Sequence, residues 1–219
     1  MRSLHTAILG TVAGLFVAVS GAQAAPLNNV FSGEFFLDTS LSGTTSALRP
    51  ELAGTVLQDV LDTFTFNGIT VTIQNRVVRE DGTGTLDFYW RIRDVEGGDI
   101  DAFRLGSFGY SFLTDADFRI DGLGVTGPDT ARLFNPADRP DGALNFLFVD
   151  GVTDSRFFFL HTNATSYAKT AEYDLLCGPE ACTSDLHETF APSVPEPASL
   201  LLLGCALAGL ALRRRKRVR

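Results

Sequence analysis

The stretch ITVTIQNRVVREDGTGTLDFYWRIR, residues 69–93, contains two segments of alternating residue character joined by a turn. The first segment alternates apolar and polar residues, with Ile69, Val71 and Ile73 between Thr70, Thr72 and Gln74. The second alternates in the same way, with Leu86, Phe88, Trp90 and Ile92 between Asp87, Tyr89, Arg91 and Arg93. Because side chains alternate between the two faces of a β-strand, each segment has one face suited to a core. Asp81-Gly82 is a hairpin signal, so we expect an antiparallel pair of strands here.

The chain between residues 25 and 190 has a strand-and-turn composition throughout. Further strand candidates follow at intervals of about ten residues: VFSGEFFLD, VLDTFTF, SFGYSFLT, ADFRID, ALNFLFVD, SRFFFLHT and AEYDLL. The only helix candidate is PELAGTVLQDVL, residues 50–61, which Gly54 and Val56 disfavour. We therefore predict an all-β fold, a single β-sandwich of jelly-roll-like type over residues 25–190.

Two segments within this region add detail to the prediction. The run Phe157-Phe158-Phe159-Leu160 has no polar face, which favours a central strand covered on both sides. The segment SDLHETFAPSVPEP, residues 184–197, loses periodicity. We expect it to form a short stalk after the sandwich, with the domain boundary at residue 190.

The N-terminal segment has the pattern of a secretory signal peptide. Arg2 precedes an apolar run over about residues 7–19, and Ala22-Gln23-Ala24 follows. The apolar run is too short to span a bilayer as a free helix. We therefore predict a signal peptide over residues 1–24, cut by signal peptidase after Ala24, with Ala22 and Ala24 as its small residues.

The C-terminal segment combines a short apolar run with a basic tail. Residues 198–212 would form a helix roughly 22 Å long, short of the roughly 30 Å hydrocarbon core, so we expect a marginal transmembrane helix. The tail over residues 213–219 contains Arg213, Arg214, Arg215, Lys216, Arg217 and Arg219. By the positive-inside rule this tail stays cytoplasmic and everything before Ala198 lies outside.

Pro195-Glu196-Pro197 stands directly before the apolar run, and its two prolines favour a stiff, extended backbone. The order Pro-Glu-Pro, short apolar helix and arginine-rich end resembles the PEP-CTERM sorting signal of Gram-negative bacteria. The resemblance implies recognition by exosortase, an integral-membrane cysteine protease or transpeptidase. It also implies that the body, residues 25–194, lies in the periplasm while the chain is transiently anchored in the inner membrane. Removal of the tail and delivery of the body to the cell surface or the extracellular matrix are implied to follow.

Charge and cysteine content agree with export. Between the two terminal segments, residues 25–194 contain 11 Lys and Arg and 25 Asp and Glu, a net charge of −14. Such an acidic surface argues against nucleic acid as a partner. Cys177 and Cys182 form an even pair around a Gly-Pro turn, and we predict a disulfide between them. Metal binding by these two cysteines, with His187 as a third ligand, is the alternative.

The sequence offers little support for an enzyme. No nucleophile-elbow pattern occurs, and His161, after an apolar strand, is interpreted as a structural or edge histidine. Retaining glycosidases need two nearby carboxyl groups. The segment most similar to the laminarinase-like pattern, Glu172 to Cys177, has a cysteine in the position of the second glutamate. We therefore predict no catalytic residues and no enzymatic activity.

One acidic cluster is a weak calcium candidate. The segment TDADFRIDGLG contains Asp115, Asp117 and Asp121, but calcium requires six to eight oxygen ligands. Ordinary acidic turns explain these residues without a metal, so we predict no cofactor and keep calcium as an alternative. The resulting expectation is a non-enzymatic surface or matrix protein, associated with exopolysaccharide and biofilm. The alternatives are a carbohydrate-binding adhesion module, with or without calcium, and a hydrolase of matrix polysaccharide.

Overall fold

A computed structural model describes residues 25–27, 30–140, 143–178 and 182–193 of the 219-residue chain. The predicted signal peptide with Ala22 and Ala24, the Pro195-Glu196-Pro197 motif, the apolar run over 198–212 and the basic tail lie outside these residues. Within the described ranges, no helix has the length and apolar character needed to cross a membrane.

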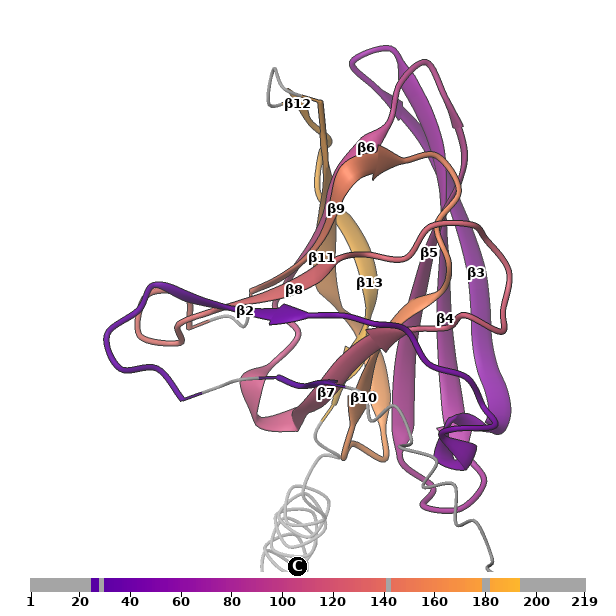
Figure 1. Cartoon of the computed structure of the whole chain (residues 1–219), viewed down its shortest axis with the longest axis vertical. Coiled ribbons are helices and arrows are strands. Elements are labelled where there is room, and N and C mark those ends of the chain that lie inside the picture. The colour runs from indigo at the N-terminus through magenta and orange to yellow at the C-terminus, as the bar shows by residue number, and fades with distance from the viewer. Residues whose placement is uncertain (1–24, 28–29, 141–142, 179–181, 194–219) are drawn as a thin grey trace, which may run out of the picture.

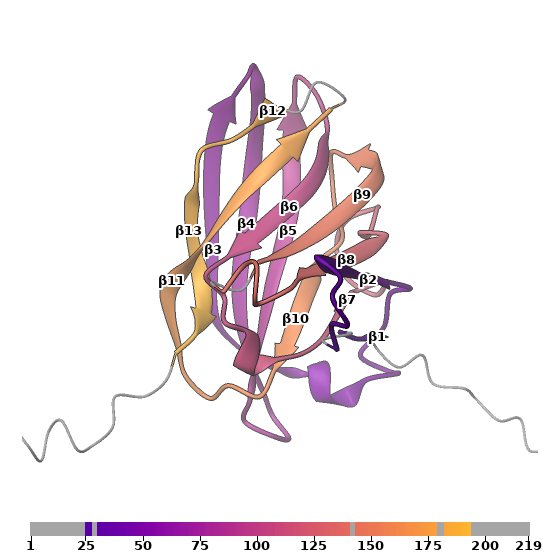
Figure 2. The ribbon, with the colours of Figure 1, turned by 90° about the vertical axis from the view of Figure 1, so that its left-hand side faces the viewer.

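The described chain forms two antiparallel sheets, as predicted, and the layers are seen in Figure 1 and, turned by 90°, in Figure 2. Sheet A contains, in spatial order, β1 (Ala25–Pro26), β7 (Leu113–Phe118), β10 (Phe158–Thr162), β5 (Leu86–Glu96), β4 (Ile69–Glu80) and β3 (Gly54–Phe66). Sheet B contains β12 (Cys182–Thr183), β11 (Tyr167–Cys177), β6 (Ile100–Gly106), β9 (Leu144–Val152), β8 (Thr130–Phe134) and β2 (Phe36–Ser40), and β13 (His187–Pro192) also pairs with β11. Two single-turn 3₁₀ helices are η1 (Pro50–Leu52) and η2 (Tyr110–Phe112).

The core lies between the inner faces of the sheets and is rich in aromatic rings. The predicted hairpin is present, since β4 and β5 pair in antiparallel register around the turn at residues 81–85. The alternating apolar residues of both strands enter the core, as expected from their period. The Trp90 ring packs against Phe103 and Phe158, with centroid distances of 5.5 and 6.2 Å, and these two rings contact each other at 5.3 Å.

The central strand β10 is buried on both faces, which confirms the expectation from its unbroken apolar sequence. It pairs with β5 on one side and β7 on the other. Phe158 and Leu160 face the core, whereas Phe157 and Phe159 belong to a second, smaller apolar cluster. Sheet A therefore has apolar packing on its outer face as well.

The helix candidate over residues 50–61 is wrong. Only Pro50–Leu52 form a helical turn, and Gly54–Phe66 form the edge strand β3. The register of β3 with β4 runs from Gly54 opposite Glu80 to Phe66 opposite Ile69. A Cβ atom at Gly54 would lie 2.1 Å from the Arg79 carbonyl oxygen, so glycine permits this close approach. Long pairing with β4 outweighs the weak helical pattern.

The predicted stalk is wrong in its first half, because His187–Pro192 form strand β13 against β11. A buried hydrogen-bond chain fixes this strand to sheet A. The Trp90 indole N–H donates to Thr189 Oγ1 (2.8 Å), and that hydroxyl donates to Asn75 Oδ1 (2.9 Å). The sandwich thus extends to Pro192, two residues beyond the predicted boundary.

Candidate functional site

The outer face of sheet A is buried around β5 and β10, and this region is the candidate site. Asp87, Tyr89 and Arg91 face away from the core, as their alternation predicts, yet each is no more than 9% exposed. Arg91 bonds to Ser155 and Asp154, and Tyr89 is covered by the segment over residues 43–53, which contains η1 and ends just before β3. This segment is called here the covering segment. Its Leu52 packs into the second apolar cluster, with Val78, Tyr89, Phe157 and Phe159.

Three titratable side chains meet on this buried face. Glu80 is the last residue of β4, Asp87 lies near the start of β5, and His161 lies near the end of β10, directly opposite Asp87 in register. Their nearest ligand atoms all lie within 4.8 Å of one another. His161 Nδ1 is 2.8 Å from Asp87 Oδ1 and 2.9 Å from Glu80 Oε1. Because Nδ1 carries at most one proton, it hydrogen-bonds to Asp87, and Glu80 Oε1 has no hydrogen-bond partner in the described chain.

Burial and charge change the proton affinity of this group. Burial raises the pKa of Asp87 to about 6, although the hydrogen bond and charge of His161 act in the opposite direction. Burial disfavours the charged form of His161, but the hydrogen bond to Asp87 and the nearby carboxylates outweigh it, so the pKa of His161 is raised. The two groups are thus coupled through one short contact.

Arg49 of the covering segment supplies a nearby cation. Its guanidinium donates to Asp115 at 3.0 and 3.3 Å and to Glu51 at 2.7 Å, and only 8% of its side chain is exposed. Asp115 lies opposite His161 in the β7–β10 register. Arg49 therefore fixes the covering segment to the strand next to the cluster.

The three aspartates of the calcium alternative lie near the covering segment. Asp115 accepts from Arg49, and Asp117 Oδ1 accepts from the backbone N–H groups of Gly43 and Phe118, at 2.8 and 2.9 Å. Asp121 accepts from Ser46 and from Arg119, and the hydrogen bond from Arg119 is the main cause that keeps the pKa of Asp121 well below its usual range. All three carboxylates thus accept hydrogen bonds from protein donors, and these contacts attach the covering segment to sheet A.

A pocket of about 460 Å³ opens on the same outer face. Its lining includes Ser46, Leu52, Arg76, Tyr89, Arg119 and Phe157. The Arg76 guanidinium lies 4.5 Å from the centroid of the Phe157 ring and bonds to Asp59 at 2.7 Å. The pocket is therefore lined by aromatic rings and by arginine side chains. Tyr89 connects it to the titratable cluster, since its hydroxyl lies 3.5 Å from Asp87 Oδ2.

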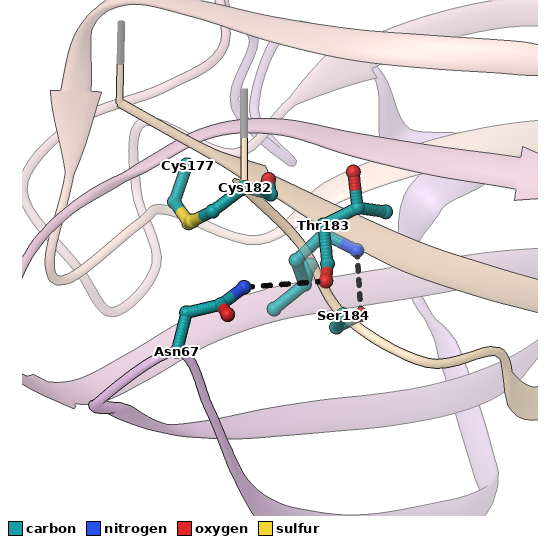
Figure 3. Close-up of a disulfide and its surroundings, with 6 residues drawn as sticks. Asn67, Cys177, Cys182, Thr183 and Ser184 are labelled. Atoms are coloured by element: carbon teal, nitrogen blue, oxygen red, sulfur yellow. Dashed lines mark hydrogen bonds between the residues drawn. A yellow bond between two sulfur atoms is a disulfide. The ribbon is translucent and has the colours of Figure 1, made fainter. Parts of the chain in front are cut away.

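The predicted disulfide is present, at the C-terminal end of β11. Cys177 and Cys182 are paired residues of β11 and β12, with Cα atoms 5.2 Å apart (Figure 3). Next to it, the Asn67 side chain, in the β3–β4 turn, contacts the Thr183 carbonyl at 3.5 Å. Cys177, which stands where the glycosidase pattern has its second glutamate, is thus part of a covalent cross-link.

The site could be recognised only partly from the sequence. The sequence places Asp87 on an outward face and Glu80 just before the Asp81-Gly82 turn signal, and it favours a structural or edge role for His161. The available signal was the apolar run around Phe158, because a strand covered on both faces requires neighbours that are covered too.

The fold and the site describe a two-sheet β-sandwich with a buried polar cluster on one outer face. Residues 193–216 match the family model of the PEP-CTERM protein-sorting motif. No curated protein and no solved structure gives a significant match to this chain. The chain is an exported, exosortase-sorted protein that reaches the cell surface.

Replacing Cys177 and Cys182 by serine should lower the free energy of unfolding by about 2 kcal/mol, because the disulfide between them closes a short loop and restricts the unfolded chain. The measurement is urea denaturation followed by the fluorescence of Trp90, the only tryptophan. Wild-type protein treated with a reductant is the control and should match the double variant. If the double variant unfolded with the same free energy as the oxidised wild type, the disulfide would have no structural role.

Proposed function

We propose that this chain is a non-enzymatic surface or extracellular-matrix protein, associated with exopolysaccharide and biofilm. The sorting motif at residues 193–216 is the observation that carries the proposal. Export through a signal peptide cut after Ala24, a transient inner-membrane anchor at residues 198–212 and a cytoplasmic basic tail complete the proposed route. In this view the sandwich is the part that stays outside the cell.

The body suits a durable extracellular component. Its hairpins, its aromatic core and the Cys177–Cys182 cross-link favour persistence outside the cell, where disulfides form and persist. The net charge of −14 over residues 25–194 favours solubility. The proposal of a non-enzymatic role draws support from Cys177, which replaces a needed carboxyl group in the glycosidase-like segment.

Replacing Pro195, Glu196 and Pro197 by alanine should leave the protein unprocessed and membrane-bound in an exosortase-bearing host. The molecular mass of the protein reports whether the tail has been removed, and cell fractionation reports whether the protein is still in the membrane. The control is Glu188→Ala, a change of an exposed side chain just before the motif, which should be processed normally. Normal release of the triple-alanine protein would overturn the sorting route.

A carbohydrate-binding adhesion module is the second candidate, favoured by an exposed aromatic patch. Phe35 and Phe36 are 50% and 38% exposed and contact the Phe134 ring at 5.5 and 6.1 Å. Arg132 lies 3.9 Å from the centroid of the Phe36 ring and is fixed by Asp38. Exposed rings of this kind can stack on sugar faces, whereas Tyr89 and Phe157 are too deeply buried to do so.

Binding of matrix polysaccharide, measured on a glycan array with and without calcium, tests this second candidate. If the patch is the site, Phe35→Ala with Phe36→Ala should lower the signal at least about tenfold, since two ring contacts are lost and each such contact contributes roughly 0.5–1.5 kcal/mol beyond its buried area. Leu186→Ala, at another exposed apolar residue, is the control and should bind normally. An absence of binding by the wild-type protein would leave the structural role as the better account.

A further inference from the structure

The part of the outer face of sheet A around Glu80, Asp87 and His161 contains more negative than positive charge. Four carboxyl groups, those of Glu51, Glu80, Asp87 and Asp115, lie around one guanidinium and one imidazole. The side chains of Glu80 and Asp87 are fully buried. Arg49 is already bonded to Glu51 and Asp115, so the single imidazole of His161 faces both buried carboxylates. Buried carboxylates in proteins are paired with cations or coordinate metals, and here one pairing partner is lacking.

Glu80 shows this deficit most directly. Its Oε2 accepts hydrogen bonds from the hydroxyls of Thr83 and Thr85, which hold the carboxylate in place. Its Oε1 is buried, has no hydrogen-bond partner in the described chain and points to His161 Nδ1 at 2.9 Å. A fully buried oxygen in this position is costly unless a ligand completes it.

The spacing of the three groups suits a metal ion. Metal–nitrogen and metal–oxygen bonds of about 2.0–2.2 Å place neighbouring ligand atoms roughly 2.9–3.4 Å apart. The contacts from His161 Nδ1 to Asp87 and Glu80, at 2.8 and 2.9 Å, lie just below and at the lower limit of this range. The ligands also come from the ends of three adjacent strands, β4, β5 and β10, which fixes their positions.

We propose that Glu80, Asp87 and His161 bind one divalent transition-metal ion that ties together the ends of β4, β5 and β10. One imidazole with two carboxylates favours Zn²⁺ or Mn²⁺ over Ca²⁺, which takes oxygen ligands alone. Arg49 and the covering segment limit access of water, while the His161 side chain, 19% exposed, leaves a path to solvent. The site is distinct from the calcium alternative at Asp115, Asp117 and Asp121, and it does not depend on the sorting route.

The test is a titration of the full-length chain, purified in detergent without a polyhistidine tag and stripped with a chelator. Zn²⁺, Mn²⁺ and Ca²⁺ are added separately as chloride salts, and binding is followed by calorimetry and by thermal unfolding. We expect one equivalent of Zn²⁺ or Mn²⁺ and a melting temperature raised by about 5–10 °C at a hundredfold excess over Kd. Calcium should have no such effect.

Isosteric variants identify the ligands. Glu80→Gln and His161→Gln should weaken binding at least about tenfold, because a neutral amide replaces an anionic carboxylate ligand in the first and an imidazole ligand in the second. The control is His187→Gln, since His187 pairs with Asp62 at 3.1 Å but meets no third ligand in the described chain, and it should bind as the wild type does. Unchanged binding in both Glu80→Gln and His161→Gln would overturn the assignment.

A measurement on the wild-type protein keeps the test independent of variant folding. With ¹⁵N-labelled histidine, added Zn²⁺ should shift the Nδ1 resonance of one body histidine, assigned to His161 by its persistence in His187→Gln. If the wild-type chain binds neither Zn²⁺ nor Mn²⁺, the proposal fails, and the cluster is a proton-sharing network of Asp87 and His161.

Discussion

Burial of sheet A on both faces is the constraint on which the rest of the structure depends. A strand with the sequence Phe157-Phe158-Phe159-Leu160 cannot leave one face in water, so the chain must provide a second layer outside the sandwich. The covering segment over residues 43–53 provides this layer. Its attachment rests on the Arg49–Asp115 ion pair, which is almost enclosed.

This second layer has a chemical consequence. Polar residues of β4, β5, β7 and β10 that lie beneath this layer are largely removed from water, and they must be satisfied within the protein. Arg49, Thr83, Thr85 and His161 supply most of the partners. Glu80 Oε1 still lacks a hydrogen-bond partner in the described chain, and this makes the face a candidate metal site. The sorting motif lies in a separate segment, residues 193–216.

The sequence predicted those features that depend on local pattern. The period-two alternation around Trp90 and the Asp81-Gly82 turn define the β4–β5 hairpin, and the apolar run of β10 predicts a central strand. The cysteine pair and the Pro-Glu-Pro motif are likewise local, and the disulfide and the motif match confirm them.

Features that depend on distant pairing were missed. Asp87 and His161 are 74 residues apart and meet only because β5 pairs with β10 in one register. Residues 60–66 were predicted as a strand, but residues 54–59 joined β3 only through their pairing with β4. His187–Pro192 became a strand through its pairing with β11 and the hydrogen bond from Trp90 to Thr189. No local pattern in these segments encodes the partner, so helix and stalk were the natural but incorrect interpretations.

The unfolding free energy of Arg49→Met, compared with that of Arg93→Met, tests the importance of the covering segment most directly. Arg93 forms a more exposed pair with Asp94, so its replacement should cost at most about 1 kcal/mol. Loss of Arg49 leaves Asp115 without its cation on a nearly enclosed face and should cost about 3 kcal/mol. Equal losses in the two variants, measured by urea denaturation through Trp90 fluorescence, would contradict the account.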